Sequence, residues 1–543
     1  MKSLYNKLII STFALAALAC SSEDDLIEDW IDVNETEEPA PGTSGDLDLS
    51  SYISIGNSLT AGFADGALYN QGQENSFPNL LAGQFAMVGG GNFNQPDINS
   101  VDGYHTSLNP SGVEGLIFGR TVLDLSAQAP VPTTTGEEIG AYTGNKANLG
   151  NFGVPGLRLS QLETAGYGFP GAGNAFFTRF ATDPNTSSVL GDALAVDRSF
   201  FTLWLGANDY LGYATSGGQG NTPLTDFSGT DFGTALGSAL GQLTADGTPG
   251  VVLDLPPVVT LPFFQAISWD RIELDAATAE TLNNGLASVN GALQGTLSAG
   301  YSDSDDIARR LISYSEGNNP ILVHDEELVD LEPYFDNLEA GMAITAQQRA
   351  ALVPYEQSRP LVDGELVLLS AGAVLGTEAD GDDTVEDTPI GVVIPLGFSF
   401  TEAANGDQYF LNAAEQAAIV TARATYNGAI SATVTALNDG GADIGLVSVQ
   451  PLFVDMLGLD AATATALALP TGSADGVQGI EVDGVTLTPD FAPNGVFSSD
   501  GIHPNPRGHA IVANEIIAVM NARWNANIPT ISVLEKLGVT FQP

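Results

Sequence analysis

Four short apolar runs, each ending in a turn, predict β-strands along the chain. They cover residues 47–55, 199–205, 251–255 and 444–449. The first run alternates apolar and polar side chains in part, and the second is rich in Phe, Leu and Trp, as expected for a buried strand. The turns that close these runs contain Gly, Asn, Asp and Pro, which end strands readily.

Longer segments with helix signals separate the strands. The expected helices span about 276–297, 413–437 and 506–524. Asp275 can cap the first helix, Asn412 with Glu415 three residues later forms a capping box for the second, and Pro506 suits the first turn of the third. Strands that alternate with helices predict a parallel α/β sheet, in which ligands bind beyond the carboxyl ends of the strands.

The alternation assigns residues 47–525 to one enlarged α/β domain with two insertions. The first insertion, near 325–407, combines acidic turns with a separate apolar run at 391–396. The second, near 460–495, is rich in loops. Residues 526–543 follow as a C-terminal extension.

The N-terminal residues predict a signal for export. Lys2 and Lys7 precede an apolar run that is too short to span a membrane but matches the core of a signal peptide over residues 1–19. The segment from Ala17 to Cys20 resembles the lipobox of bacterial lipoproteins, which implies cleavage before Cys20 and lipidation of its thiol. That family usually has Leu at the position of Ala17, and an ordinary secretory signal is the alternative.

Residues 20–46 are acidic and rich in turn formers, with little to bury, so they predict a tether. Lipid chains on Cys20 would then hold the protein at a membrane. An acidic stretch just after the lipidated cysteine resembles the export signal of Bacteroidetes surface lipoproteins, although short acidic tracts also occur in ordinary linkers. We therefore expect an exported lipoprotein of the outer membrane, with the cell surface as one location.

The charge balance narrows the possible partners. The chain carries 66 Asp and Glu against 16 Lys and Arg, for a formal charge of −50 and a pI near 4.1. Because binding to nucleic acid depends on neutralising phosphates with a basic face, this composition excludes a nucleic-acid binder of that kind. A single Cys excludes an internal disulfide framework, and with 4 His no metal or cofactor is expected.

The small number of histidines shortens the search for a catalytic base. His503 lies in the sequence D-G-I-H-P, where Asp500 three residues earlier can reach one ring nitrogen while the other points outward. On its own this motif also fits a loop with a solvent-facing histidine. His509 is expected to pack in the last helix or lie at the surface, and His105 and His324 are expected in solvated loops.

Three further motifs accompany this one. In chain order the four are Gly56-Asn57-Ser58-Leu59, Asn151-Phe152-Gly153-Val154-Pro155-Gly156, Gly206-Ala207-Asn208-Asp209 and Asp500-Gly501-Ile502-His503-Pro504. Together and in this order they resemble the SGNH (GDSL-type) hydrolase family, over a discontinuous region from about residue 47 to 525. One departure is Asn57, where the family commonly has Asp, and it should disturb local hydrogen bonding more than the chemistry.

The resemblance implies a flavodoxin-like three-layer α/β/α fold with a parallel central sheet and long insertions. It also implies that Ser58 is the nucleophile, His503 the general base and Asp500 the acid that orients the imidazole. No G-x-S-x-G elbow surrounds Ser58, which disfavours an α/β-hydrolase.

The family also implies an oxyanion hole. Its donors would be the backbone N–H groups of Ser58 and Gly156 and the side-chain amide of Asn208, with Gly153 as the alternative to Gly156. The reaction expected is hydrolysis of carboxylic esters through an acyl-enzyme, by an esterase, lipase or carbohydrate deacetylase acting on small-molecule or glycan-borne acyl esters. The competing hypothesis is a non-catalytic cell-surface protein that binds glycans or lipids on a hydrolase-like scaffold.

Overall fold

A computed structural model of the protein describes residues 42–109, 115–124, 129–219, 228–377, 389–399, 406, 408–472, 474–491 and 494–538. The expected signal peptide, the lipidation site at Cys20 and most of the acidic tether lie outside these residues and stay predictions. None of the helices in the described part of the chain combines the length and the apolar character that a membrane span requires.

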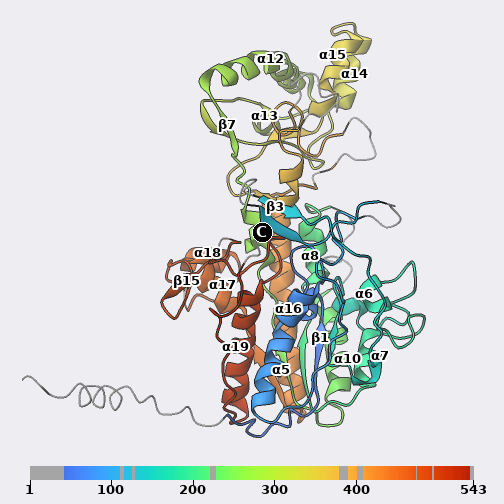
Figure 1. Ribbon diagram of the computed structural model, residues 1–543. Helices are drawn as coiled ribbons and strands as arrows, with labels where there is room; N and C mark the ends of the chain where they lie inside the picture. The colour runs from blue at the N-terminus through green and yellow to red at the C-terminus, as the bar shows by residue number, and fades with distance from the viewer. Residues whose placement is uncertain are drawn as a thin grey trace, which may run out of the picture. The chain divides into compact units, whose positions relative to one another are not determined.

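A five-stranded parallel sheet forms the centre of the fold (Figure 1). Its strands are β1 (Tyr52–Gly56), β4 (Asn151–Gly153), β5 (Phe200–Trp204), β6 (Gly250–Leu253) and β13 (Ile444–Val447), in the spatial order β13-β6-β5-β1-β4. Every neighbouring pair is parallel. The predicted parallel α/β sheet is therefore confirmed, and β4 adds a strand that the apolar pattern did not show because it is only three residues long.

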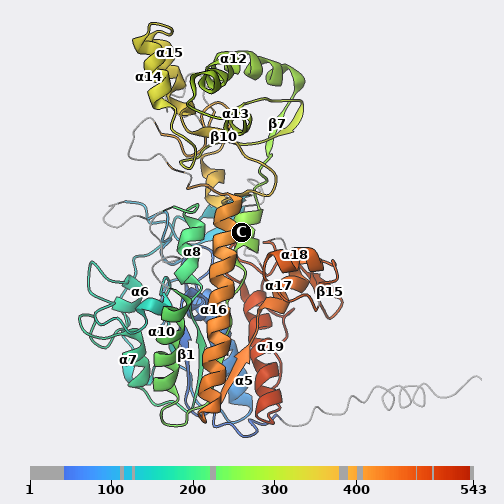
Figure 2. The same cartoon turned by 180° about the vertical axis from the view of Figure 1, so that it is seen from behind.

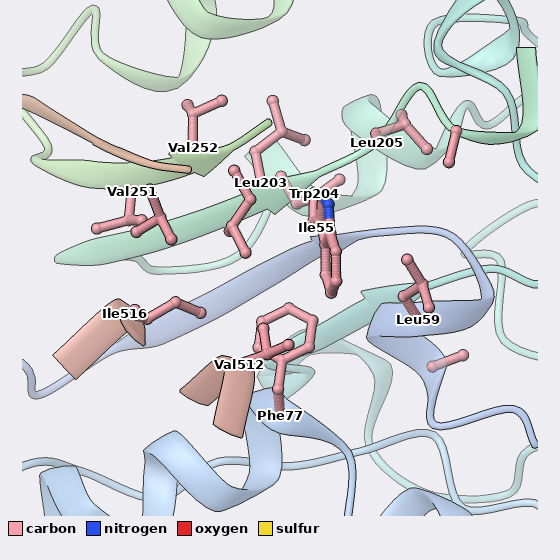
Figure 3. Close-up of a cluster of buried hydrophobic side chains, with 14 of the residues drawn as sticks. Ile55, Leu59, Phe77, Leu203, Trp204, Leu205, Val251, Val252, Val512 and Ile516 are labelled. Atoms are coloured by element: carbon pink, nitrogen blue, oxygen red, sulfur yellow. The ribbon is translucent and has the colours of Figure 1, made fainter. Parts of the chain in front are cut away.

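Helices pack on both faces of this sheet, an arrangement compatible with a three-layer α/β fold. Figures 1 and 2, turned by 180°, show α5 (Phe77–Met87) and α19 (Pro506–Arg523) on one face and α10 (Gly229–Leu243) and α16 (Ala413–Asp439) on the other. On the first face the Trp204 ring of β5 lies 5.6 Å from the Phe77 ring, and Figure 3 shows this contact beside Val512. On the second, Phe232 of α10 stacks on Tyr426 of α16 at 4.3 Å.

Local capping signals place the long helices where the sequence predicts them. Asp275 accepts a hydrogen bond from Thr278 N at 2.7 Å and caps α12 (Ala276–Ala299). Asn412 and Glu415 form the predicted capping box of α16, and Pro506 is the first residue of α19. The helix α12 runs two residues beyond the expected end, to Ala299, and Gly300 ends it in a left-handed conformation, which glycine adopts without a Cβ penalty.

The chain between α11 (Pro262–Gln265) and α16 packs around two hydrophobic clusters of its own. Its elements are β7 (Ile272–Leu274), α12, α13 (Ser304–Arg310), β8 (Gly317–Asn319), β9 (Leu322–His324), α14 (Glu332–Ala340), α15 (Ala346–Leu352), β10 (Ser358–Pro360), β11 (Leu366–Val367) and β12 (Phe410–Leu411). The separately packed residues begin at Ile267, ahead of the segment 325–407 that the sequence pattern singled out. Its helix α12 has the capped, periodic pattern of any α/β helix, so the pattern alone does not separate it from the central domain.

A smaller excursion follows β13. It contains α17 (Gln450–Leu457), α18 (Ala461–Ala466), β14 (Ile480–Val482) and β15 (Val485–Leu487). The fully buried Arg423 of α16 anchors it, since the guanidinium donates to Gln450 Oε1 at 2.8 Å and to the carbonyls of Leu467 and Ala468. A buried guanidinium with several acceptors holds neighbouring segments firmly because losing any partner leaves a buried charge unpaired.

Shorter elements complete the described chain. They are α3 (Ser58–Ala61), α4 (Asn70–Glu74), β2 (Thr121–Asp124), β3 (Ala129–Pro132), α6 (Ala175–Thr178), α7 (Val189–Leu194), α8 (Asn208–Thr215) and the 3₁₀ turns at 146–148, 159–161, 258–260, 353–355 and 369–373. Two of them, α3 and α8, begin at the carboxyl ends of β1 and β5, which are neighbours in the sheet. Ser58 and Asn208 therefore start from the same edge, as the parallel pattern predicts.

Candidate active site

Ser58 lies at a sharp turn between β1 and α3. Asn57 caps α3, since its Oδ1 accepts from Leu59 N at 3.0 Å, and an aspartate could accept the same bond. The turn is tight at Gly56, where a Cβ would lie 2.1 Å from Thr60 Oγ1 and 2.5 Å from Trp204 O. Only glycine fits there. Ser58 is the first residue of α3, and its backbone N–H has no acceptor among the described residues.

Two glycines compete for the second backbone donor, and their surroundings differ. Gly153 N already donates to Asn151 Oδ1 at 2.8 Å, and a Cβ there would lie 2.3 Å from Ala61 N. Gly156 is exposed, has φ +81°, and its N–H has no acceptor in the described chain. The positive φ is open to glycine without strain. The free N–H favours Gly156 over Gly153 as a donor to a ligand.

The loop after Gly156 is tied to the helix that carries Asn208. One N–H of the Asn208 side-chain amide donates to Leu157 O at 3.0 Å, which leaves the other for a ligand. The neighbouring carboxylate of Asp209 accepts from Leu159 N at 2.7 Å and from Ser160 Oγ at 3.1 Å. Burial raises the pKa of Asp209 to about 6, against the effect of these donors. The two segments are thereby held in fixed relation.

His503 and Asp500 meet as their spacing predicts. His503 Nδ1 lies 2.9 Å from Asp500 Oδ2, while Asp500 Oδ1 accepts from the backbone N–H groups of Ile502 and His503, both at 2.9 Å. Burial opposes ionisation of the carboxyl, but the imidazole and these donors hold the pKa of Asp500 well below its usual range. Because an ionised carboxylate can only accept, the proton of a neutral imidazole at this position belongs on Nδ1, and Nε2 of that tautomer is an acceptor.

A second carboxylate, which the sequence analysis did not single out, positions this turn. Asp65 accepts from Ser499 N at 2.9 Å, from Ser499 Oγ at 2.7 Å and from Tyr69 OH at 2.7 Å. The adjacent Gly66 N donates to Asp500 Oδ2 at 3.1 Å. Burial, with the like charge of Asp500, raises the pKa of Asp65. No sequence signal marks the link between Asp65 and the turn, because Ser499 lies 434 positions away.

One pocket brings the candidate residues together. Ser58, Asn208 and His503 all contribute to its lining, and the rest of the lining is almost wholly apolar. None of the described hydrogen bonds joins Ser58 to His503; catalytic hydrogen bonds are often long in free enzymes and tighten when substrate binds. Asn57 also lines the pocket, whereas Gly156 belongs to the adjoining loop.

The remaining histidines lie elsewhere. The expectation of a solvated loop is wrong for His324, which is buried in β9 because that strand pairs with β10 inside the separately packed region. His105 is half-buried, with its ring against Gly66. Within the described residues no group of three or more His, Cys, Asp and Glu could hold a metal ion.

His509 is buried in α19, as one of its two expected placements had it. Its Nδ1 accepts from Phe77 N at 3.3 Å, and its Nε2 has no hydrogen-bond partner among the described residues. Burial, reinforced by the nearby His503, lowers the pKa of His509 from 6.5 to about 3. The folded protein therefore binds this proton less readily than the unfolded chain does.

This histidine predicts an acid-sensitive contribution to stability. A lowered folded-state pKa means that the contribution is complete above 6.5 and is lost as pH falls toward 3. The loss amounts to about 3 kcal/mol at pH 4. His509→Gln keeps an amide oxygen that can accept from Phe77 N. The difference in unfolding free energy between this variant and the unmodified protein should shrink by about this amount between pH 7 and pH 4. Denaturant titrations at both pH values measure it, and parallel pH curves would contradict it.

Comparisons with known proteins add no relative to this geometry. A scan against protein-family models finds no match, and neither do searches of curated proteins and of solved structures. The assignment of function therefore depends on the residues and their arrangement.

Proposed function

We propose that the protein is a serine hydrolase of carboxylic esters, with Ser58 as nucleophile, His503 as general base and Asp500 as the acid that orients it. The observation that carries this proposal is the Asp500–His503 pair, joined at 2.9 Å, with His503 on the wall of the same pocket as Ser58 and Asn208. A carboxylate on one imidazole nitrogen, with a serine in the pocket that the imidazole lines, is the arrangement that activates a hydroxyl.

The topology supports the same proposal. In chain order the five strands lie 2-1-3-4-5, which is the order of flavodoxin-like sheets. The residues after β1 and β5 border the point where this order reverses, and ligands of doubly wound sheets bind there. The SGNH resemblance of the four motifs implies both the sheet order and this location.

The proposed reaction follows from the protonation states. His503 Nε2 takes the proton of Ser58 Oγ as the oxygen attacks the ester carbonyl carbon. The tetrahedral intermediate collapses when the carbon–oxygen bond to the alcohol breaks, and the alcohol leaves with the proton from His503. Water, deprotonated by His503, then attacks the acyl-enzyme and releases the carboxylic acid and free Ser58.

The oxyanion would be held by three donors for which the described residues offer no acceptor. They are the backbone N–H of Ser58, the backbone N–H of Gly156 and the second amide N–H of Asn208. Donors that are already in place stabilise charge as it develops, without reorganisation.

The direct test is hydrolysis of p-nitrophenyl esters of increasing acyl length by residues 21–543. Turnover that is abolished by a covalent serine probe, with the probe's mass found on the peptide that contains Ser58, supports the proposal. Binding of a glycan or lipid without turnover of any ester would instead favour the non-catalytic alternative.

Removing one oxyanion donor gives a graded prediction. Asn208→Ala is expected to lower kcat by about 10²- to 10³-fold, with a smaller change in KM, because the lost bond forms mainly in the transition state. Steady-state kinetics on one p-nitrophenyl ester measure it. Asn79→Ala on α5 is the matched control, since that amide also donates to a backbone carbonyl but lies outside the pocket. Equal kcat values for the two variants would show that Asn208 is not an oxyanion donor.

A further inference from the structure

The pocket beside Ser58 has a cavity volume of about 60 Å³, and its lining extends well beyond the proposed triad. Beyond the four polar residues Asn57, Ser58, Asn208 and His503, its lining consists of aliphatic and aromatic side chains, with prolines, glycine and alanine. These come from several parts of the fold: the ends of the central strands with α3 and α8, the turn at 258–261, α17, the loop at 496–504 and α19. The apolar lining begins directly next to the catalytic groups.

Exposure gives the pocket a mouth and a floor. Leu211 and Phe453 are half-buried, so they mark the side nearer to solvent, whereas the buried Trp204 and Val512 mark the side nearer to the core. Figure 3 shows Trp204 and Val512 close together above Phe77 of α5. A chain that extends from Ser58 toward this floor therefore meets mainly hydrocarbon.

The floor offers no polar partner. The one polar atom of Trp204, Nε1, already donates to Asp254 O at 2.9 Å. A sugar or other polyhydroxyl group placed here would lose its hydrogen bonds to water without replacing them, which is costly. A hydrocarbon chain loses nothing and gains from leaving water.

One wall belongs to the excursion after β13. Phe453 and Met456 of α17 line the pocket opposite α19, and Arg423 anchors α17 through Gln450. The Phe453 ring also lies 6.4 Å from the Phe497 ring, which lines the pocket too. The chain segment outside the central α/β domain thus decides how much room the pocket has.

We propose that this pocket is the subsite for the acyl chain, so that the substrates are esters of straight-chain aliphatic acids longer than acetate and α17 sets the accepted chain length. This inference rests on the proposed ester hydrolysis at Ser58. Each methylene buried should raise kcat/KM by roughly fourfold until the chain reaches the floor. We expect kcat/KM to rise at least tenfold from the acetyl ester to the hexanoyl or octanoyl ester.

The length prediction is tested by narrowing and widening the α17 wall. Met456→Trp fills space in the pocket. It should lower kcat/KM for the octanoyl ester, relative to kcat/KM for the acetyl ester, at least tenfold. Phe453→Ala opens the mouth and should shift the optimum to longer chains. Met87→Trp at the exposed end of α5 is the matched control for the first substitution, and thermal unfolding confirms that each variant is folded. An unchanged ratio in Met456→Trp would overturn the role of α17.

Two further measurements separate failure of the subsite from failure of the enzyme. If hydrolysis of the acetyl ester depends on Ser58 but kcat/KM does not rise with longer acyl chains, the acyl subsite is overturned and the proposed esterase activity stands. A gain with the length of the alcohol instead, in a series of alkyl acetates, would assign the pocket to the leaving group. Calorimetry of methyl octanoate and methyl acetate with Ser58→Ala reads binding without turnover. If methyl octanoate binds and methyl acetate does not, and if adding Met456→Trp to Ser58→Ala weakens the binding of methyl octanoate, the subsite is supported. Equal binding of the two esters, or binding of neither, overturns it.

Discussion

Ser58→Ala is expected to lower kcat for ester hydrolysis by about 10⁵- to 10⁶-fold, the largest effect of any single substitution here. Losing the nucleophile removes the acyl-enzyme route altogether and leaves only the oxyanion donors and substrate binding to assist water. The backbone N–H of residue 58 stays in place, so substrate affinity should change little. Active-site titration and steady-state rates on a p-nitrophenyl ester measure the loss.

The control for this variant is Ser298→Ala on α12, an exposed serine whose hydroxyl donates to Gly295 O. Both variants should unfold at temperatures close to that of the unmodified protein. If Ser58→Ala hydrolyses esters at a near-normal rate, Ser58 is not the nucleophile and the assignment of the site falls with it. Failure of a covalent serine probe to label the unmodified protein would point to the same conclusion.

Asp500→Asn is expected to lower kcat by about 10³- to 10⁴-fold while leaving the fold intact. In the native protein the carboxylate keeps the proton on His503 Nδ1. An amide at this position can present its N–H to Nδ1, which then acts as acceptor, and the proton moves to Nε2. An imidazole with Nε2 protonated cannot accept the proton of Ser58, so the base is lost although all the side chains remain near their places.

The tautomer makes this prediction separable from a structural effect. Nitrogen NMR of His503 should show the proton on Nδ1 in the unmodified protein and on Nε2 in the variant. Asp275→Asn is the matched control, because asparagine caps a helix as well as aspartate does. A rate loss below tenfold, with the Nε2 tautomer observed, would show that another group serves as the base.

The network behind Asp500 explains how a loop near the end of the chain is held at the first strand. Asp65 binds Ser499 through both its backbone N–H and its hydroxyl, and Gly66 binds Asp500 itself. The carboxylate that orients His503 is thus tied to the segment that follows Ser58. These hydrogen bonds relate the segment after Ser58 to His503, although none of the described hydrogen bonds joins the two residues directly.

Much of the fold and part of the site were open to prediction because they depend on short-range physics. Apolar runs mark β1, β5, β6 and β13, since a strand buried on both faces has few polar residues. The caps at Asp275 and Asn412 bond to backbone within three residues. The Asp500–His503 pair is equally local, because three residues separate its members. Patterns of this range are written in consecutive residues.

The tertiary structure decided the features that depend on distant partners. Gly156 is favoured over Gly153 because Asn151 and the backbone of α3 occupy the latter. Asp65 gains its role from Ser499, 434 positions away. The pocket proposed for the acyl chain is lined jointly by α17, α19 and the residues after β1 and β5, and no single segment forms it. Hydrogen bonds to near neighbours select local conformation, so the starts of strands and helices, and the residue types that can do the chemistry, follow from the sequence. Packing between remote segments sets which backbone N–H groups stay free and which cavity Ser58 faces.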